Sequence, residues 1–139
     1  MLSFRIGKQG SCGNLMEIDT PAPGPGQIGL EIHACALNFA DLLMVEGRYQ
    51  DTPPLPFTPG LECAGRVTAV GDDISEFQIG DRVAVFGGQG GLAEFGVFAA
   101  ARAVPLPASV GYDVAAASLI AYGTSLLARE QRARLPEGG

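Results

Sequence analysis

The stretch PGLECAGRVTAVGDD, residues 59–73, has the pattern of a buried strand held between two turns. Pro59-Gly60 and Gly71-Asp72-Asp73 are turn signals, and the residues between them are mostly small, β-branched or apolar. A buried strand seldom carries a charge, yet Glu62 lies near its start with the chemically inert Leu61 beside it. The stretch therefore predicts a central strand, and its acid needs either a partner or a function.

Further strands are predicted on both sides of this stretch. Residues 27–37 alternate between apolar and other side chains, as Ile28, Leu30 and Ile32 illustrate, and this is the period of a half-buried strand. Strands are also expected over 62–71, 81–87 and 91–100. Short strands at spacings of about ten residues favour a small, partly open barrel over a parallel sheet. The predicted fold class is mainly β, with α structure at the C-terminal end.

Two helical segments are predicted. NFADLLMVEG, residues 38–47, reads as one or two helical turns that end at Gly47. Residues 113–134 are rich in alanine and leucine, which favours a helix, with Ser109 as a plausible cap and an interruption near Gly123. The order of elements is therefore several short strands followed by helix.

Composition and charge exclude several classes of protein. The 139 residues suit one domain, and the net charge of −6 argues against a nucleic-acid surface. Three cysteines without a C-x-x-C pair, and a single histidine, His33, support neither a disulfide framework nor a zinc site nor a Ser-His-Asp hydrolase. No run reaches transmembrane length and no signal-peptide pattern begins the chain. We therefore expect a cytoplasmic protein without nucleic-acid or membrane partners.

A glycine-rich run, GGQGG at residues 87–91, invites comparison with phosphate-binding loops. It lacks the Gly-Lys-Ser/Thr ending of one such loop and the spacing of the dinucleotide-binding loop. Turn chemistry instead predicts a tight hairpin between two strands. No nucleotide fingerprint is expected within these residues.

Residues 36–83, ALNFADLLMVEGRYQDTPPLPFTPGLECAGRVTAVGDDISEFQIGDRV, carry a family resemblance. They resemble the catalytic domain of the medium-chain dehydrogenase/reductase superfamily, and specifically its zinc-free quinone oxidoreductase (zeta-crystallin-like) branch. The resemblance implies a GroES-like, partly open β-barrel over residues 1–110. It also implies a helical connector over 111–139 that leads to a Rossmann domain absent from this sequence.

The departures from the zinc-binding pattern of this superfamily indicate the chemistry. Its zinc members carry a Gly-His-Glu motif, whose conserved positions are matched here by Gly60, Glu62, Gly65, Gly71 and Ile74. Leu61 stands where the zinc-binding histidine would be, and Asn38 stands where a zinc-binding cysteine would be. Without these two ligands there is no Lewis acid to polarise an alcohol. The resemblance therefore implies zinc-free hydride transfer from NADPH to quinones or activated enones.

The same resemblance implies which residues form the site. Asn38 would approach the nicotinamide and the substrate carbonyl, Tyr49 would line the substrate pocket, and Thr124 would lie near the nicotinamide. The structural alternatives are a helix cap for Asn38, loop packing for Tyr49 and a helix-carbonyl bond for Thr124. Asp41 and Glu62 are expected to be structural acids, with Glu62 pairing with Arg48, Arg66 or a backbone amide.

Alternatives of substrate and class remain open from the sequence. One is an enoyl reductase of the same superfamily that acts on acyl thioesters. Another is a non-catalytic binding or structural protein of the co-chaperonin or crystallin kind. For the lead interpretation we expect a full-length homodimer with a small-molecule substrate, and an isolated fragment that is inactive and binds NADPH weakly, because the main cofactor site lies in the absent domain.

Overall fold

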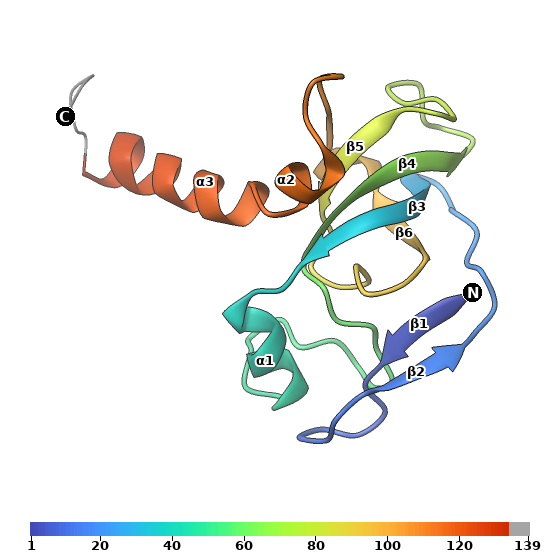
Figure 1. Cartoon of the computed structure of the whole chain (residues 1–139), viewed down its shortest axis with the longest axis vertical. Helices are drawn as coiled ribbons and strands as arrows, with labels where there is room; N and C mark the ends of the chain where they lie inside the picture. Colours follow the sequence, from blue (N-terminus) through green and yellow to red (C-terminus); the bar gives the residue numbers. More distant parts are fainter. Residues whose placement is uncertain (134–139) are drawn as a thin grey trace.

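The computed structural model describes residues 1–133, and these fold mainly into β-strands (Figure 1). Residues 134–139, which end the predicted connector, lie outside the described residues. The strands are β1 (Leu2–Arg5), β2 (Asn14–Glu17), β3 (Gln27–Ala36), β4 (Glu62–Val70), β5 (Arg82–Phe86), β6 (Phe95–Ala99) and β7 (Ala103–Pro105). The helices are α1 (Phe39–Val45), α2 (Tyr112–Ala116) and α3 (Leu119–Leu126), with a 3₁₀ turn at Ala100–Arg102 and a π-helical segment at Leu127–Arg132.

Five strands form one antiparallel sheet in the order β6-β3-β4-β5-β7, while β1 and β2 form a separate hairpin. The hairpin and α1 lie on the same side of the sheet, and α3 extends away from the body of the molecule (Figure 1). This arrangement confirms the mainly β fold class with helices at the C-terminal end. The strands predicted over 27–37, 62–71 and 81–87 are observed, each within one residue of its expected ends, whereas the strand predicted over 91–100 is shorter and is observed as β6, Phe95–Ala99.

Alternation of side chains along the central strands separates the two faces of the sheet. One face buries a core made of Ile28, Leu30, Cys63, Val67, Val83, Val85, Phe98 and Ala100. The other face presents Ala64 and Ala84, against which Ala115 and Ala116 of α2 pack. Methyl side chains let helix and sheet approach closely, so α2 lies directly against the sheet.

A second apolar cluster joins α1 to the loop that precedes β4. It contains Ile6, Met44, Phe57 and Leu61, with Tyr49 and Ile120 packed against it. Leu61 is 3% exposed, so the residue beside the acid of β4 is a core side chain. The cluster fixes the start of β4 relative to α1.

Two glycines in the stretch 59–73 are required by close backbone contacts. Gly60 has a φ of +103°, and a Cβ there would lie 2.8 Å from both the Cys35 sulfur and the Gly91 Cα. A Cβ at Gly65 would lie 2.1 Å from the backbone oxygen of Glu31 on the neighbouring strand. Both glycines therefore allow backbones to approach where a side chain could not fit.

The glycine-rich run 87–91 does not form the predicted hairpin. It follows β5 and leads to β6, but β6 pairs with β3 at the opposite edge of the sheet, so the two strands are not neighbours. The run instead lies along the loop before β4, and its amides, with that of Leu92, donate to backbone oxygens of that loop. The bonds are Gly88 to Leu61 (3.1 Å), Gly90 to Thr58 (2.8 Å), Gly91 to Gly60 (3.0 Å) and Leu92 to Pro59 (3.0 Å).

Two helix predictions need correction and one is confirmed. The predicted stop of α1 is observed, with Gly47 at a φ of +68°. The residue that caps α2 is Gly111 rather than Ser109. The C-terminal helical run breaks at Ala117 and Ser118, not near Gly123, which lies inside α3. Glycine costs a helix only about 1 kcal/mol relative to alanine, so it did not break α3.

Among the described residues, no helix is long and apolar enough to cross a membrane.

Candidate functional site

Asn38 is the N-cap residue of α1, and its backbone is held by the first turn of that helix. Its N–H donates to Asp41 Oδ2 (2.9 Å), and its backbone oxygen accepts from the Asp41 N–H (3.0 Å). Its side-chain amide turns toward β4, where Nδ2 donates to Glu62 Oε1 (3.1 Å). The helix-cap alternative is therefore observed, and the side chain additionally links α1 to β4.

Glu62, the acid that the sequence left unexplained, is 2% exposed and has a partner on each oxygen. Oε1 accepts from Asn38 Nδ2, and Oε2 accepts from the backbone N–H of Ile120 in the first turn of α3 (3.0 Å). The predicted backbone-amide partner is thus confirmed. The predicted arginine partners were wrong, because Arg48 pairs with Glu46 (3.0 Å) and Arg66 with Glu31 (2.8 Å), both on the surface.

Asp41 is the second buried acid of the site, with 4% of its surface exposed. Besides the Asn38 contact, its Oδ1 accepts from the Gly60 N–H (2.7 Å), so it ties α1 to the start of the stretch 59–73. Burial raises the pKa of Asp41, which the backbone hydrogen bonds partly oppose. Within residues 1–133 neither buried acid forms an ion pair. Backbone and side-chain amides are their partners, as expected of structural acids.

Two thiols lie close to these acids. Cys35 and Cys63 face each other across β3 and β4. Burial, with contributions from the neighbouring acids, raises the pKa of each thiol to about 12. Within residues 1–133, no three histidine, cysteine or acidic side chains are grouped so as to hold a metal ion.

Tyr49 and Thr124 lie in two neighbouring crevices. Tyr49 is half-buried and lines a crevice of about 510 Å³, together with Leu61, Phe86 and Arg102. Thr124 is exposed on α3 and lines a crevice of about 360 Å³, together with Ile120, Phe86 and Arg102. Both Tyr49 and Ile120 pack against the same apolar cluster. The structure therefore brings Asn38, Tyr49 and Thr124 into one region, connected through Glu62 and Ile120.

Phe86 and Arg102 line both crevices, and sequence reasoning did not single them out. The Arg102 guanidinium lies 5.5 Å from the centre of the Phe86 ring and donates to the Phe86 backbone oxygen (3.4 Å). Phe86 ends a strand and Arg102 ends a 3₁₀ turn, and neither position carries a motif. Only their shared position beside β7 in the folded sheet brings them together.

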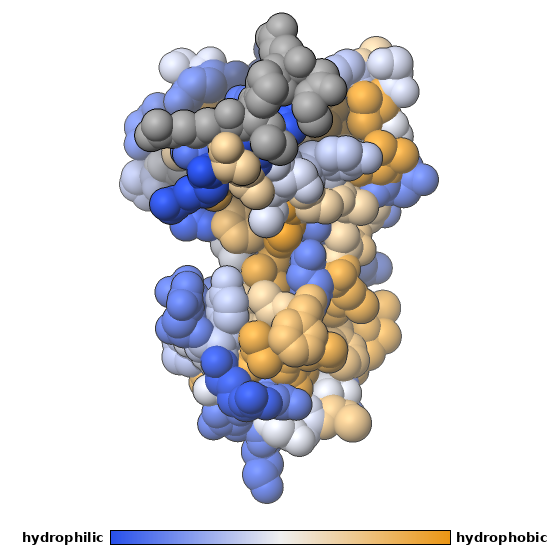
Figure 2. Space-filling model, turned by 90° about the vertical axis from the view of Figure 1, so that its left-hand side faces the viewer, coloured by the Kyte–Doolittle hydropathy of each residue, from blue (hydrophilic) through white to orange (hydrophobic). Residues whose placement is uncertain are grey.

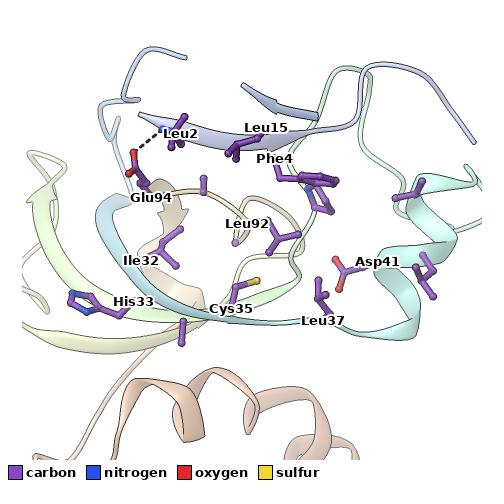
Figure 3. Close-up of a pocket in the computed structure, with 16 residues that line it drawn as sticks. Leu2, Phe4, Leu15, Ile32, His33, Cys35, Leu37, Asp41, Leu92 and Glu94 are labelled. Carbon is purple, nitrogen blue, oxygen red and sulfur yellow. Dashed lines mark hydrogen bonds between the residues drawn. The ribbon is translucent and has the colours of Figure 1, made fainter. Parts of the chain in front are cut away.

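A larger hollow, of about 750 Å³, lies elsewhere, between the β1–β2 hairpin, β3 and α1. Figure 3 shows its mostly apolar lining, with Asp41 at one end and Glu94 at the other, where Glu94 accepts from the Leu2 N–H (2.7 Å). Figure 2 shows apolar residues gathered on the lower part of the face that carries α1. Leu37, Phe39 and Leu42, which lie in or just before α1, are exposed. Asn38, Tyr49 and Thr124 do not line this hollow.

Residues 24–108 match the family model described as the alcohol dehydrogenase GroES-like domain. The chain therefore belongs to the GroES-like domain family of alcohol dehydrogenases. Its relatives, described below, place it in the medium-chain dehydrogenase/reductase superfamily, as the resemblance implied.

Four known proteins illustrate the match. The chain is 45% identical over 107 residues to the synaptic vesicle membrane protein VAT-1 homolog of Rattus norvegicus, covering 77% of this chain and 26% of that protein. It is 37% identical over 124 residues to quinone oxidoreductase-like protein 2 of Mus musculus, covering 89% and 35%. The crystal structure of the human synaptic vesicle membrane protein VAT-1 homolog-like protein superposes with a TM-score of 0.94, at 30% identity, over 99% of this chain and 45% of that one. The Escherichia coli quinone oxidoreductase complexed with NADPH gives a TM-score of 0.86, at 27% identity, over 96% and 41%.

The chain thus spans roughly a quarter to a third of these two curated relatives.

Proposed function

We propose that the full-length protein is an NADPH-dependent, zinc-independent oxidoreductase that reduces quinones or activated enones by hydride transfer. Quinone oxidoreductase-like relatives and the likeness to an NADPH complex of a quinone oxidoreductase support an oxidoreductase of this kind. We further propose that it is cytoplasmic, as its sequence pattern suggests, and a homodimer, as the family resemblance implies.

One observation carries the zinc-independent part of the proposal. At the two positions where zinc members of the superfamily hold ligands, this chain has Leu61 and Asn38. The Leu61 side chain is buried among apolar residues, and the Asn38 amide nitrogen already donates a hydrogen bond to Glu62. Neither offers zinc the thiolate or imidazole that it favours. Reduction of a carbonyl or quinone needs orientation and a dry pocket more than it needs a Lewis acid.

The residues of this chain fit one end of NADPH only. The crevice beside Thr124 is mostly apolar, with one side-chain hydroxyl and the Arg102 guanidinium as its polar groups, which suits a flat nicotinamide. The N-terminus of α3, the kind of position that binds phosphate in other proteins, is already occupied by the Glu62 carboxylate. A phosphate would be repelled there, so we propose that the pyrophosphate binds away from this helix end.

The chain's own side chains then have distinct roles in the proposed reaction. When bound, NADPH supplies the hydride. Tyr49 and Phe86 form aromatic walls against which a flat quinone can stack. Asn38 and Thr124 provide the polar atoms that orient the reacting ring, and the apolar cluster beneath Tyr49 excludes water from this side.

The decisive experiment follows NADPH oxidation by the full-length protein with a quinone, and separately NADP⁺ reduction with an alcohol. We expect quinone reduction that survives a chelator and a preparation without stoichiometric zinc. Replacement of Tyr49 by leucine keeps the apolar packing but removes the aromatic wall, and should lower kcat/KM for the quinone roughly two- to tenfold.

The matched control is Tyr122→Leu, since Tyr122 is 73% exposed on α3 and lies in neither crevice. It should leave kcat/KM unchanged. Chelator-sensitive alcohol oxidation, or stoichiometric bound zinc, would contradict the proposed chemistry.

A further inference from the structure

Helix α3, which carries Thr124, is weakly held by its own residues. None of its side chains is fully buried, and it extends away from the sheet (Figure 1). Its N-cap residue, Ser118, makes no capping bond, because the Ser118 hydroxyl donates backward to the Val114 oxygen. The first-turn N–H groups of a helix need acceptors, so this helix requires one from another element.

Glu62 supplies that acceptor from β4. Its Oε2 lies 3.0 Å from the N–H of Ile120, the second residue of α3, which is the N–H that an N-cap side chain normally binds. The carboxylate also places negative charge at the positive end of the helix dipole. Residue 62 and residue 120 are 58 positions apart, so the cap joins two distant parts of the chain.

The other oxygen of Glu62 determines which way the Asn38 amide faces. A carboxylate can only accept, so Asn38 must turn Nδ2 toward Oε1, as observed. This leaves the second N–H of Asn38 as the side-chain donor available to a ligand, since its side-chain oxygen faces the backbone of the first turn in the capping box of α1. One buried acid therefore sets the position of α3 and the orientation of the Asn38 amide together.

We propose that Glu62 is a positioning residue that caps α3 and fixes the amide orientation of Asn38, so that Asn38 and Thr124 keep their positions relative to each other. The effect of Glu62 on catalysis rests on the function proposed above. The effect of Glu62 on the structure does not depend on that function, and it is tested on the 139-residue chain without cofactor or substrate.

Three replacements separate the two roles of Glu62. Glu62→Ala removes both. Glu62→Gln keeps an acceptor for the Ile120 N–H, but its amide nitrogen must then face Asn38, which has to turn its own oxygen inward. Asn38→Asp together with Glu62→Gln exchanges the carboxylate and the amide, so the contact can form again with its donor and acceptor reversed.

Amide hydrogen exchange measured by NMR tests the cap. In Glu62→Ala we expect the Ile120 N–H and the first turn of α3 to exchange roughly 2- to 30-fold faster, as for loss of a helix cap. In Glu62→Gln the same amides should stay within about fivefold of the parent, because only the charge is lost. Glu76→Gln is the matched control, since Glu76 is exposed and distant in sequence from α3. It should leave the exchange rates of the Ile120 N–H and of the first turn of α3 unchanged.

The Asn38 side-chain amide tests the orientation. In Glu62→Gln its protons should exchange about tenfold faster or more, because they lose a hydrogen bond to a charged group. Asn38→Asp alone places two carboxylates together and should lower the urea midpoint, whereas Asn38→Asp/Glu62→Gln should recover much of that loss. Unchanged Ile120 exchange in Glu62→Ala, or strictly additive effects of the two substitutions, would overturn the inference.

Kinetics of the full-length enzyme test the consequence for catalysis. Glu62→Gln should lower kcat for quinone reduction roughly ten- to a hundredfold, as for a misplaced reacting group. The double variant, which restores the hydrogen bond between positions 38 and 62, should recover part of this loss. If NMR shows the expected pattern but no variant or parent reduces a quinone, the proposed function fails and the positioning role stands. If the parent is active and Glu62→Gln keeps full kcat, the positioning role in catalysis fails.

Discussion

At the start of β4, two neighbouring residues have opposite surroundings. Leu61 enters an apolar cluster with Met44 and Phe57, whereas Glu62 is surrounded by hydrogen-bond donors from two other elements. Leu61 is the last residue of the loop before β4, and Glu62 is the first residue of the strand. The junction of loop and strand thus places a core residue and a buried acid side by side without conflict.

The thiols near this acid give a prediction at the same scale. With a pKa of about 12 for both Cys35 and Cys63, only about one thiol in ten thousand is ionised at pH 8, and the thiolate is the reactive form. We expect a thiol reagent at pH 8 to modify the exposed Cys12 of the folded chain quickly, and the other two at least about a hundredfold more slowly. Mass spectrometry over time measures this, with the urea-unfolded chain as the reference for three reactive thiols. Equal labelling of all three in the folded chain contradicts the raised pKa values.

At the scale of elements, glycines with different surroundings should respond in opposite ways to alanine. Gly65→Ala forces a methyl against the Glu31 backbone oxygen between β3 and β4 and should destabilise the fold by at least about 2 kcal/mol. Gly123→Ala, in open space on α3, should stabilise it by about 0.5–1 kcal/mol. Urea unfolding of both variants and the parent measures the two changes. A loss of stability in Gly123→Ala would mean that α3 is not helical at that position.

The elements also show what a sequence can and cannot predict. The alternation in 27–36 and the turn signals around 59–73 predicted β3 and β4, because burial on one face imposes a period of two on the residues themselves. The partners of the GGQGG run were not predictable in this way. They are backbone oxygens of a distant loop, and a backbone oxygen leaves no signature in the sequence.

In the candidate site, too, contacts within one element could be predicted from the sequence, and contacts between distant elements could not. Asn38 and Asp41 could be assigned to a helix start from local pattern, and their contacts confirm it. The contact of Glu62 with the Ile120 N–H and the shared role of Phe86 and Arg102 depend on how the strands are ordered in space. The roles of Asn38, Tyr49 and Thr124 toward a ligand stay predictions.

At the scale of the whole molecule, the charge of the chain is expected to weaken cofactor binding. The chain carries a net charge of −6, and Glu62 occupies the N-terminus of α3. We therefore expect residues 1–139 alone to bind NADPH weakly or not at all, because the net charge opposes the phosphates and the N-terminus of α3 is already occupied. Fluorescence titration with NADPH measures this, and the full-length protein is the positive control. Micromolar binding by the 139-residue chain is the result that contradicts it.

The positions of the later residues of α3 depend on the angle of its first turn, because a helix moves as a rigid rod. An α-helix rises 1.5 Å per residue, so Thr124 lies about 6 Å and Leu126, the last residue of α3, about 9 Å beyond Ile120. A tilt of about 5° at the first turn then displaces Thr124 by about 0.5 Å and Leu126 by about 0.8 Å. Both displacements reach the tolerance of about 0.5 Å within which a working site must hold its groups. The angle that α3 makes at one buried carboxylate therefore decides how precisely Thr124 is placed.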